Sequence, residues 1–503
     1  AQASWVQAGA WGISKIFCMS YWLTKESTFE QNLDPLFMPD FADSFDPSLV
    51  IESTYGSGRY QRRLAIFPGA FYILSFIFTQ LPIFTLPKLA ADPSSPLFTS
   101  SSIKDSQTLL FVGWALGCLF VTPIADKLGR LRLTCGLAIM AVLATGASTM
   151  LTDVGSLAPF SLALFLSGLG MSGINTAYLL IQESIPLRLR GPATVALNVS
   201  NTIALLCMAI ICGTVTRNMD WRAETVVFLC PLLLSITASV CFIHESLHFL
   251  ASRERWSEAW IVAKAIALVN QAHHVHWPTN RPTNRDPQLG SAFGARGGIN
   301  GSTEMPSRPR LCQRPWAVNT LAATVCWTSV SLGYYGISFS AGNLSSDLYV
   351  NVALIATVDL PGYFLPIVLH TRLGWRRTLQ GSLFIAAICL LTCGALQQGT
   401  LAMMACALFA RLLIDVGFNM VYVLSMECFA TEIRSTAMGV CQFVARLTSA
   451  FAPLASRFPA STSCPIFGIV CLAAAVAVSF LTEVTRGTRR DTIWSNRALL
   501  AGG

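Results

Sequence analysis

The stretch Ala125-Asp-Lys-Leu-Gly-Arg-Leu-Arg132 is a short, basic turn between two apolar runs, each long enough to cross a lipid bilayer as a helix. A degraded copy, Thr371-Arg-Leu-Gly-Trp-Arg-Arg377, follows at an offset of 245 residues, measured from Asp126 to Thr371. A basic turn repeated at this distance indicates that the chain contains two related halves.

Two further sets of charged residues repeat at nearly the same offset. They are Glu183 with Arg190 and Glu427 with Arg434, 244 residues apart, and Glu245 with Glu483, 238 residues apart. Three offsets this close indicate an internal duplication, and duplicated helical halves are a common plan of secondary transporters.

The composition is that of an all-α membrane protein. Charged residues make up 12% of the chain and hydrophobic residues 53%, whereas a soluble protein carries about twice that share of charge. Each apolar run predicts a spanning helix, because a helix satisfies its own backbone hydrogen bonds in lipid. Twelve spans are predicted, at residues 64–86, 109–125, 133–151, 159–182, 193–215, 225–243, 316–339, 348–369, 379–396, 401–424, 437–455 and 465–481.

The 34 Lys and Arg residues predict the orientation. With both termini in the cytoplasm, loops on that side carry 25 of them and outer loops carry five, the others lying in spans or in the N-terminal segment. This asymmetry follows the positive-inside rule, so the net charge of +8 reflects topology and predicts no nucleic-acid partner. We expect a multi-pass protein embedded in the lipid bilayer of the plasma membrane.

The pattern divides the chain into five segments. They are an N-terminal segment of unclear structure (1–55), a six-helix half (56–243), a cytoplasmic loop (244–314), a second six-helix half (315–482) and a cytoplasmic tail (483–503). Residues 26–52 are acidic and predict a solvated tail. Residues 256–270 have helical periodicity and are expected to lie along the membrane surface, ahead of a flexible linker.

Several short motifs, taken together and in order, resemble a known family. They are Gly56-Ser-Gly-Arg-Tyr-Gln61, the Asp126 turn, Glu183 with Arg190, Glu245-Ser246 before Arg255-Trp-Ser-Glu-Ala259, Tyr334-Tyr-Gly336, Val358-Asp-Leu-Pro361, and Glu427 with Arg434. Over about residues 56–495 the chain resembles solute carrier family 22, the organic ion transporters of the major facilitator superfamily. The resemblance implies the major facilitator fold, with two six-helix halves, and transport of small organic ions by alternating access.

The chain also departs from the family pattern. Leu164 stands where the fourth span usually carries Arg, and Thr371 stands where the second turn usually carries Asp. Further departures are Thr122 for Gly, Leu247-His248 for Pro-Arg, and Ala430 and Thr482 for Pro. These departures keep a second hypothesis open, in which the fold serves as a cell-surface receptor or scaffold with a protein partner and little transport.

Charged residues at helix ends on the inner face are the candidate gating residues, because opposite charges there can hold the two halves together. In the first half they are Asp126, Arg130, Glu183, Arg188 and Arg190, and in the second Glu427, Arg434 and Arg376. The alternative, that these residues only set topology, explains the Arg residues but not the acids. We expect the missing acid at Thr371 to weaken the second set.

Charges inside spans are the sharpest functional signals, because burying one costs at least about 2.5–3.5 kcal/mol at mid-membrane. Arg411 and Asp415 lie four residues apart on one helix face and are expected to pair with each other, although a functional role stays open. Asp359 is the third such residue. Arg446 has no local partner, and its planar fork suits a carboxylate or sulfate.

The resemblance also predicts the sign of the charge on the expected substrate. In the family, the position of Arg446 tends to be Arg in organic-anion members and Asp in cation members, so anions are favoured. The Lys that anion members often carry in span eight is Tyr363 here, which removes one of two expected cationic contacts.

Aromatic residues complete the predicted substrate pocket, with rings that cover apolar surface and hydroxyls that orient the substrate. The candidates are Tyr178, Trp327, Tyr334, Tyr335, Tyr363 and Tyr422, each with helix packing as the alternative. Asn343 is a weak glycosylation candidate. No enzyme motif, phosphate-binding loop or metal-ligand cluster stands out, so we expect a non-enzymatic protein without cofactors.

Overall fold

The computed structural model describes residues 47–93, 95–121, 124–152, 156–272, 316–340, 347–397, 399–429 and 431–482. Within these ranges, the side chains of 74–77, 187–188, 191, 425–427 and 431–436 are not described. The predicted linker, the C-terminal tail, Asn343 and most of the N-terminal segment therefore lie outside the described residues.

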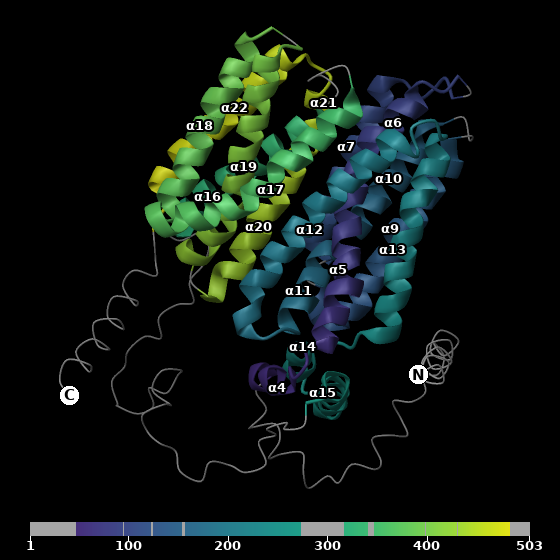
Figure 1. The fold of residues 1–503 in the computed structure, drawn as a ribbon, viewed down its shortest axis with the longest axis vertical. Coiled ribbons are helices and arrows are strands. Elements are labelled where there is room, and N and C mark those ends of the chain that lie inside the picture. The colour runs from purple at the N-terminus through teal and green to yellow at the C-terminus, as the bar shows by residue number, and fades with distance from the viewer. Residues whose placement is uncertain are drawn as a thin grey trace, which may run out of the picture.

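The described secondary structure is helical throughout, in two groups of spans (Figure 1). The first group is α5 (Arg59–Gln80) with α6 (Pro82–Ala90), α7 (Ser100–Leu116) with the π-helical turn η3 (Gly117–Val121), α9 (Arg130–Leu151), α10 (Leu157–Met171) with α11 (Gly173–Glu183), α12 (Leu187–Thr214) and α13 (Trp221–Phe242). The second is α16 (Trp316–Phe339), α17 (Leu348–Leu373), α18 (Trp375–Ala395), α19 (Leu401–Cys428), α20 (Thr431–Ser449) with α21 (Ala452–Ala455), and α22 (Ala460–Ala477) with η7 (Val478–Phe480).

Ten spans in the described chain are long and apolar enough to cross a membrane. The other two predicted spans are α7 with η3, and α16, which carry more polar residues. Those polar residues face protein rather than lipid, because Gln107 of α7 and Asn319, Ser329 and Ser331 of α16 are all buried. The twelve helices therefore form an all-α membrane fold of two six-helix halves, as the sequence predicts.

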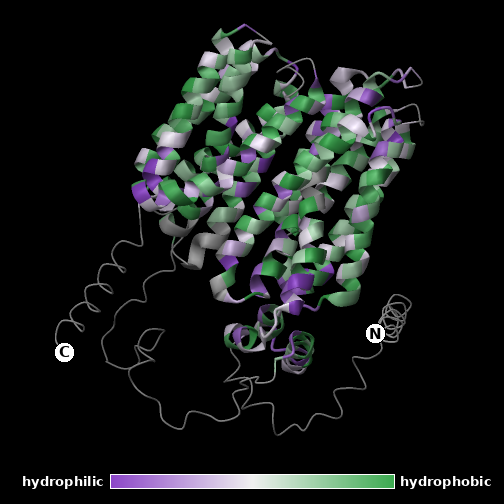
Figure 2. Ribbon diagram, in the orientation of Figure 1, coloured by the Kyte–Doolittle hydropathy of each residue, from purple (hydrophilic) through white to green (hydrophobic). Residues whose placement is uncertain are grey.

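Hydrophobic residues predominate along the long helices of the bundle (Figure 2). Leu143, Leu234 and Ile469 are 59–71% exposed in the middle of long helices. Surface of this kind is unfavourable in water and favourable in lipid, so it belongs in the hydrocarbon of a bilayer.

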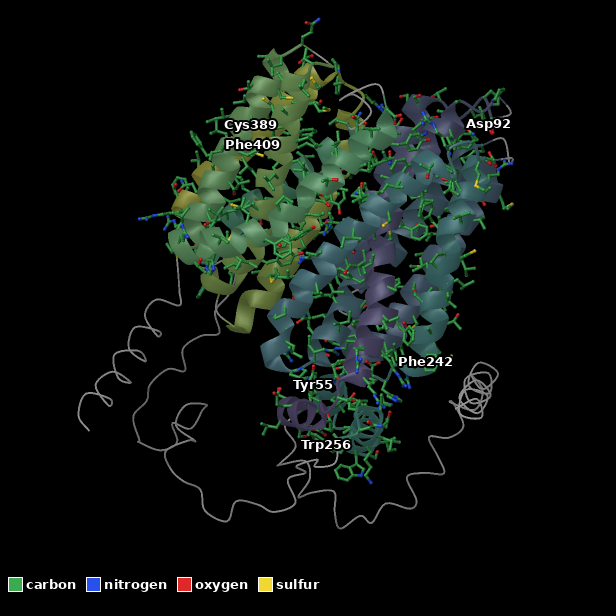
Figure 3. All side chains as sticks on the ribbon, in the orientation of Figure 1. Tyr55, Asp92, Phe242, Trp256, Cys389 and Phe409 are labelled. Atoms are coloured by element: carbon green, nitrogen blue, oxygen red, sulfur yellow. The ribbon has the colours of Figure 1, made fainter. Side chains whose placement is uncertain are left out.

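Three short helices lie below one end of the bundle: α4 (Pro47–Thr54), α14 (Leu247–Ser252) and α15 (Trp256–Asn270) (Figure 1). Tyr55 and Trp256 mark this end, which we call the α15 end, and Asp92 marks the opposite, α6 end (Figure 3). The helix predicted over 256–270 is confirmed. Asn270 is fully buried there and accepts a hydrogen bond from the backbone N–H of Tyr60 at 2.7 Å.

The interpretation of residues 26–52 as a solvated tail is wrong at its C-terminal end. Val50 and Ile51 of α4 are 1% and 2% exposed and pack with α14 and α15. The sequence did not predict this helix because it has only two turns. Its few apolar residues give little pattern within an acidic stretch. Residues 26–46 lie outside the described chain.

The two halves meet through two pairs of helices. Helix α12 packs against α17, and α7 packs against α20 and α21. The halves also touch through aromatic rings, Phe84 of α6 with Tyr349 of α17 and Phe111 of α7 with Tyr335 of α16.

Candidate functional site

Arg446 lies on α20, facing α7 of the other half. Its guanidinium carbon is 4.1 Å from the ring centroid of Trp114, and its Nη1 donates a hydrogen bond of 3.2 Å to the hydroxyl of Tyr335. The side chain is half-buried, and within the described chain no carboxylate forms an ion pair with it. The site therefore holds an uncompensated positive charge at the junction of the halves.

Polar and aromatic groups from both halves lie around this charge. The π-helical turn η3 carries Cys118, whose sulfur accepts a hydrogen bond from Asn175 at 3.3 Å. Cys118, Tyr72 and Tyr422 lie within electrostatic range of Arg446. A π-turn commonly occurs at functional sites because it redirects one side chain out of the regular helical register.

Two of the predicted aromatic residues, Tyr178 and Tyr422, border this region. Tyr178 is half-buried, 6.1 Å from Tyr72 between ring centroids, and its hydroxyl bonds Thr194 of α12 at 2.9 Å. Tyr422 is 40% exposed although it lies within the predicted tenth span. We call the group formed by Arg446, Trp114, Tyr335, Tyr72, Tyr178 and Tyr422 the central site.

Trp327 and Tyr334 pack against members of the central site and are buried, as Trp114 and Tyr335 are. Trp327 is 1% exposed and contacts Tyr422 edge-on at 4.8 Å, so it supports that ring from behind. Tyr334 is 5% exposed and packs against Tyr335 at 5.3 Å.

The predicted pairing of Arg411 with Asp415 is wrong. Arg411 instead binds Asp359 of α17 through two hydrogen bonds of 2.7 Å, one from Nε and one from Nη2, and both side chains are fully buried. Its remaining donor, Nη1, binds the carbonyl of Tyr334 and the hydroxyl of Ser338. A planar fork meets a carboxylate best head-on, and Asp359 on the facing helix offers that geometry.

Asp415 is consequently left without a cation of its own. It is 2% exposed, and its Oδ2 has no hydrogen-bond partner in the described chain. Gly362 of α17 faces the Asp415 carboxylate. The next residue, Tyr363, is half-buried and accepts a hydrogen bond of 3.3 Å from Thr202 of α12.

At the α15 end, the first-half gating residues form a connected network. Arg130 contacts Asp126 at 3.0 Å and Glu183 at 3.2 Å, and Ser246 donates to Glu183 at 2.5 Å. Glu245 accepts from the backbone N–H of Arg130 at 2.9 Å, where it caps α9. Glu245 belongs to a repeat and to a family motif but is not among the gating residues that the sequence predicts; its place at the end of an apolar run is the signal that could have indicated this role.

Of the other candidate gating residues, the structure describes the side chains of Arg190 and Arg376, and it shows neither one in this network. Arg190 forms no ion pair in the described chain, and its Nε has no partner. Arg376 donates to the carbonyl of Ser479 at 2.5 Å and pairs with no acid among the described side chains, consistent with Thr371 in place of the family's Asp. The side chains of Glu427, Arg434 and Arg188 lie outside the description.

The α6 end holds ion pairs that the sequence did not predict. Arg457 binds Asp105 at 2.5 Å, Lys104 donates to the carbonyl of Ser456 at 3.0 Å, and Arg217 lies 3.6 Å from Asp347. Each contact joins one half to the other. Residues far apart in the chain make them, so spacing carried no signal.

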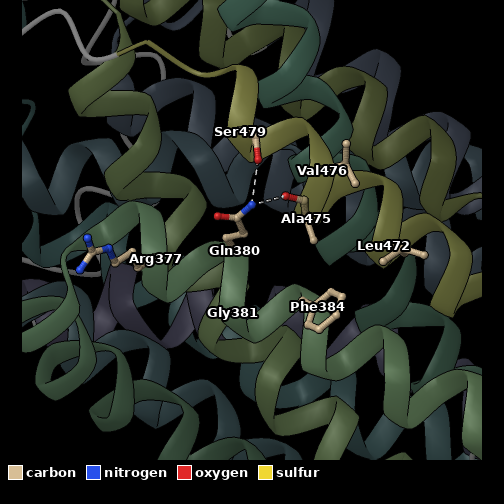
Figure 4. A pocket seen from close by; sticks show the side chains of 8 residues that line it. All are labelled: Arg377, Gln380, Gly381, Phe384, Leu472, Ala475, Val476 and Ser479. Atoms are coloured by element: carbon tan, nitrogen blue, oxygen red, sulfur yellow. Dashed lines mark hydrogen bonds between the residues drawn. The ribbon is translucent and has the colours of Figure 1, made fainter.

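A surface groove lies elsewhere, between α18 and α22 near the α15 end (Figure 4). Gln380 spans it with hydrogen bonds to Ala475 and Ser479, and Phe384 and Leu472 line it. It contains none of the predicted substrate-binding residues. Among the described residues, no group of three His, Cys, Asp or Glu could hold a metal ion.

Comparisons with known proteins agree with this architecture. Residues 66–453 match the pattern of the Major Facilitator Superfamily. The xylose transporter XylE from E. coli, in a partially occluded inward open conformation, superposes with a TM-score of 0.61 at 14% identity, covering 83% of this chain and 98% of that one. The chain therefore belongs to the major facilitator superfamily, a class of membrane transporters rather than enzymes.

Within that class, curated relatives are solute carrier family 22 proteins, which confirms the resemblance. Solute carrier family 22 member 15 of Xenopus tropicalis is 28% identical over 412 residues, 78% of this chain and 72% of the relative. The organic cation/carnitine transporter 2 of Mus musculus is 26% identical over 378 residues, 72% of this chain and 61% of the relative.

Proposed function

We propose that this transporter carries small organic ions, with a preference for anions, through the central site. The observation that carries the proposal is Arg446, a half-buried cation between the halves with no carboxylate partner in the described chain. A buried charge without a counter-ion is costly, and a bound carboxylate or sulfonate would supply that counter-ion.

The rings around Arg446 suit an aromatic or otherwise apolar substrate body. Tyr178 and Tyr422 are partly exposed in this region, and the hydroxyl of the buried Tyr335 accepts a hydrogen bond from Arg446. Because one relative is named as a cation/carnitine transporter, the sign of the substrate rests on Arg446 and not on the comparisons.

Alternating access fits the distribution of contacts between the halves. Among the described residues, the ion pairs that join them lie at the α6 end, whereas the network at the α15 end lies within the first half. We therefore assign the structure to an inward-facing state, with the α15 end and both termini in the cytoplasm and the α6 end outside the plasma membrane.

The test is uptake into proteoliposomes that contain the purified full chain, using labelled aromatic carboxylates, aromatic sulfonates and tetraalkylammonium cations. We expect uptake of an anion and its loss in Arg446→Ala. Lys264→Ala, which removes an exposed cation of α15, is the control for loss of positive charge alone. Anion uptake that survives Arg446→Ala would overturn the assignment of the site, and a folded wild type that carries nothing would favour the receptor hypothesis.

A further inference from the structure

The buried interface of α16, α17 and α19 contains one cation and two carboxylates. Arg411 binds Asp359 through two hydrogen bonds. Asp415 lies one helical turn from Arg411 on α19, and its Oδ2 has no partner in the described chain. Gly362 of α17, which has no side chain, faces the Asp415 carboxylate. The charges balance only if one of the two acids holds a proton.

Asp415 is the acid that the geometry favours as the proton carrier. Its Oδ2 is buried without a donor, while both oxygens of Asp359 accept from Arg411. An ionised carboxylate buried without a partner is penalised by several kcal/mol, and the neutral acid is penalised much less.

We infer that Asp415 is a proton-binding site whose protonation is coupled to transport, an inference that rests on the proposed function. With the proton on Asp415, Arg411 stays on Asp359 and ties α19 to α17. When Asp415 gives its proton to water, its carboxylate becomes a second anion one turn from Arg411 on the same helix face. The guanidinium then divides between Asp359 and Asp415, and the tie between the helices weakens.

The surroundings of Asp415 connect this equilibrium to the central site. The charged and titratable groups that face it are Arg411 on its own helix, Asp359 and Tyr363 on α17, and Tyr334 on α16. Tyr334 stacks edge-on against Tyr335, the residue that accepts from Arg446. Tyr363 reaches the other half through Thr202.

The experiment uses purified full-length protein in two measurements, with Asp415→Asn as the test and Asp220→Asn as the control. Asp220 is an exposed residue of the loop before α13. Infrared difference spectroscopy between acidic and alkaline buffer detects a protonated carboxylic acid without any substrate. Uptake of the best-carried labelled carboxylate is then measured with and without a pH gradient, alongside counterflow without a gradient.

We expect a carboxylic-acid band at neutral pH in the wild type and in Asp220→Asn, and its loss in Asp415→Asn. An acidic outside should raise wild-type accumulation by up to about tenfold per pH unit for one proton. Asp415→Asn should retain counterflow and lose this response. A missing band, or gradient-driven accumulation in Asp415→Asn, would overturn the inference, as would wild-type uptake that ignores the gradient. If neither the wild type nor the two variants show counterflow, the proposed transport itself would be refuted.

Discussion

At the scale of single residues, the sequence identified Arg446 of the central site but not the ring that it contacts. Its position inside a span, without an acid nearby in sequence, was sufficient to mark it. Trp114, the ring on which its guanidinium rests, was missed because it lies 332 positions earlier (114 to 446), in the other half. Contacts across the halves leave no periodicity in the chain.

Trp114→Leu removes that ring and should weaken transport while the protein still folds. A partly desolvated cation–π contact contributes about 0.5–2 kcal/mol, so we expect the KM for an organic anion to change by up to about 30-fold. Trp114→Phe keeps an aromatic face and should retain most of the wild-type value. Equal KM values in Leu and Phe variants, at matched surface expression, would show that the ring does not position Arg446.

Arg411 shows where local spacing misleads. Asp415 lies four residues after Arg411 on the same helix. Arg411 nevertheless binds Asp359 on a neighbouring helix, because that carboxylate meets the guanidinium head-on. Removing one partner of a buried pair leaves an uncompensated charge, so Asp359→Asn should destabilise the protein by about 3–5 kcal/mol. Thermal unfolding of the purified protein measures this effect, with Asp220→Asn as the control. An unchanged unfolding temperature would contradict the structural role of the pair.

At the scale of elements, the two repeated turns adopt the same backbone conformation. Gly129 has φ 103° and ψ 153°, and Gly374 has φ 81° and ψ 160°. Both values of φ are positive, where residues with a side chain are strained. The turns differ in surroundings, because Glu245 lies against Gly129 whereas no atom from outside the turn lies within 4 Å of a Cβ placed at Gly374.

This difference gives a matched pair of variants. Gly129→Ala and Gly374→Ala carry the same backbone strain, but only the first also displaces the carboxylate that caps α9. We expect Gly129→Ala to lower stability by about 1 kcal/mol more, the usual contribution of a helix cap. Chemical unfolding of both variants measures the difference. A larger loss for Gly374→Ala would contradict the capping role of Glu245.

The sequence predicted elements better than it predicted their contacts. Apolar length alone located the spans, and α15 was placed at residues 256–270 from its periodicity. The short helix α4 escaped notice because two turns in an acidic stretch carry little pattern. The partners of Arg411, Arg376 and Arg457 all lie on other helices, so only the folded structure could reveal them.

At the scale of the whole molecule, the contacts at the α6 end hold the two halves together. Asp105 and Arg457 carry opposite charges on opposite halves, with Lys104 and Ser456 beside them. Each exposed ion pair contributes only about 0–1 kcal/mol, so the pairs bias a balance between states rather than fix one.

Reversing one charge should shift that balance. Asp105→Arg or Arg457→Asp should each move the population toward a state open at the α6 end, and the double reversal should restore it. Pulsed EPR between spin-labelled unnatural residues at Leu97 and Phe458, both exposed at this end, measures the shift. A distance distribution that stays the same in both single variants would contradict a gate at this position.

The central claim, that Arg446 holds the transported anion, is tested most directly by inverting its charge. Counterflow in proteoliposomes of the wild type and Arg446→Asp is measured with one labelled aromatic carboxylate and one labelled tetraalkylammonium ion. We predict that the wild type exchanges the carboxylate and that Arg446→Asp loses this activity in favour of the cation. Unchanged carboxylate counterflow in Arg446→Asp would contradict the claim.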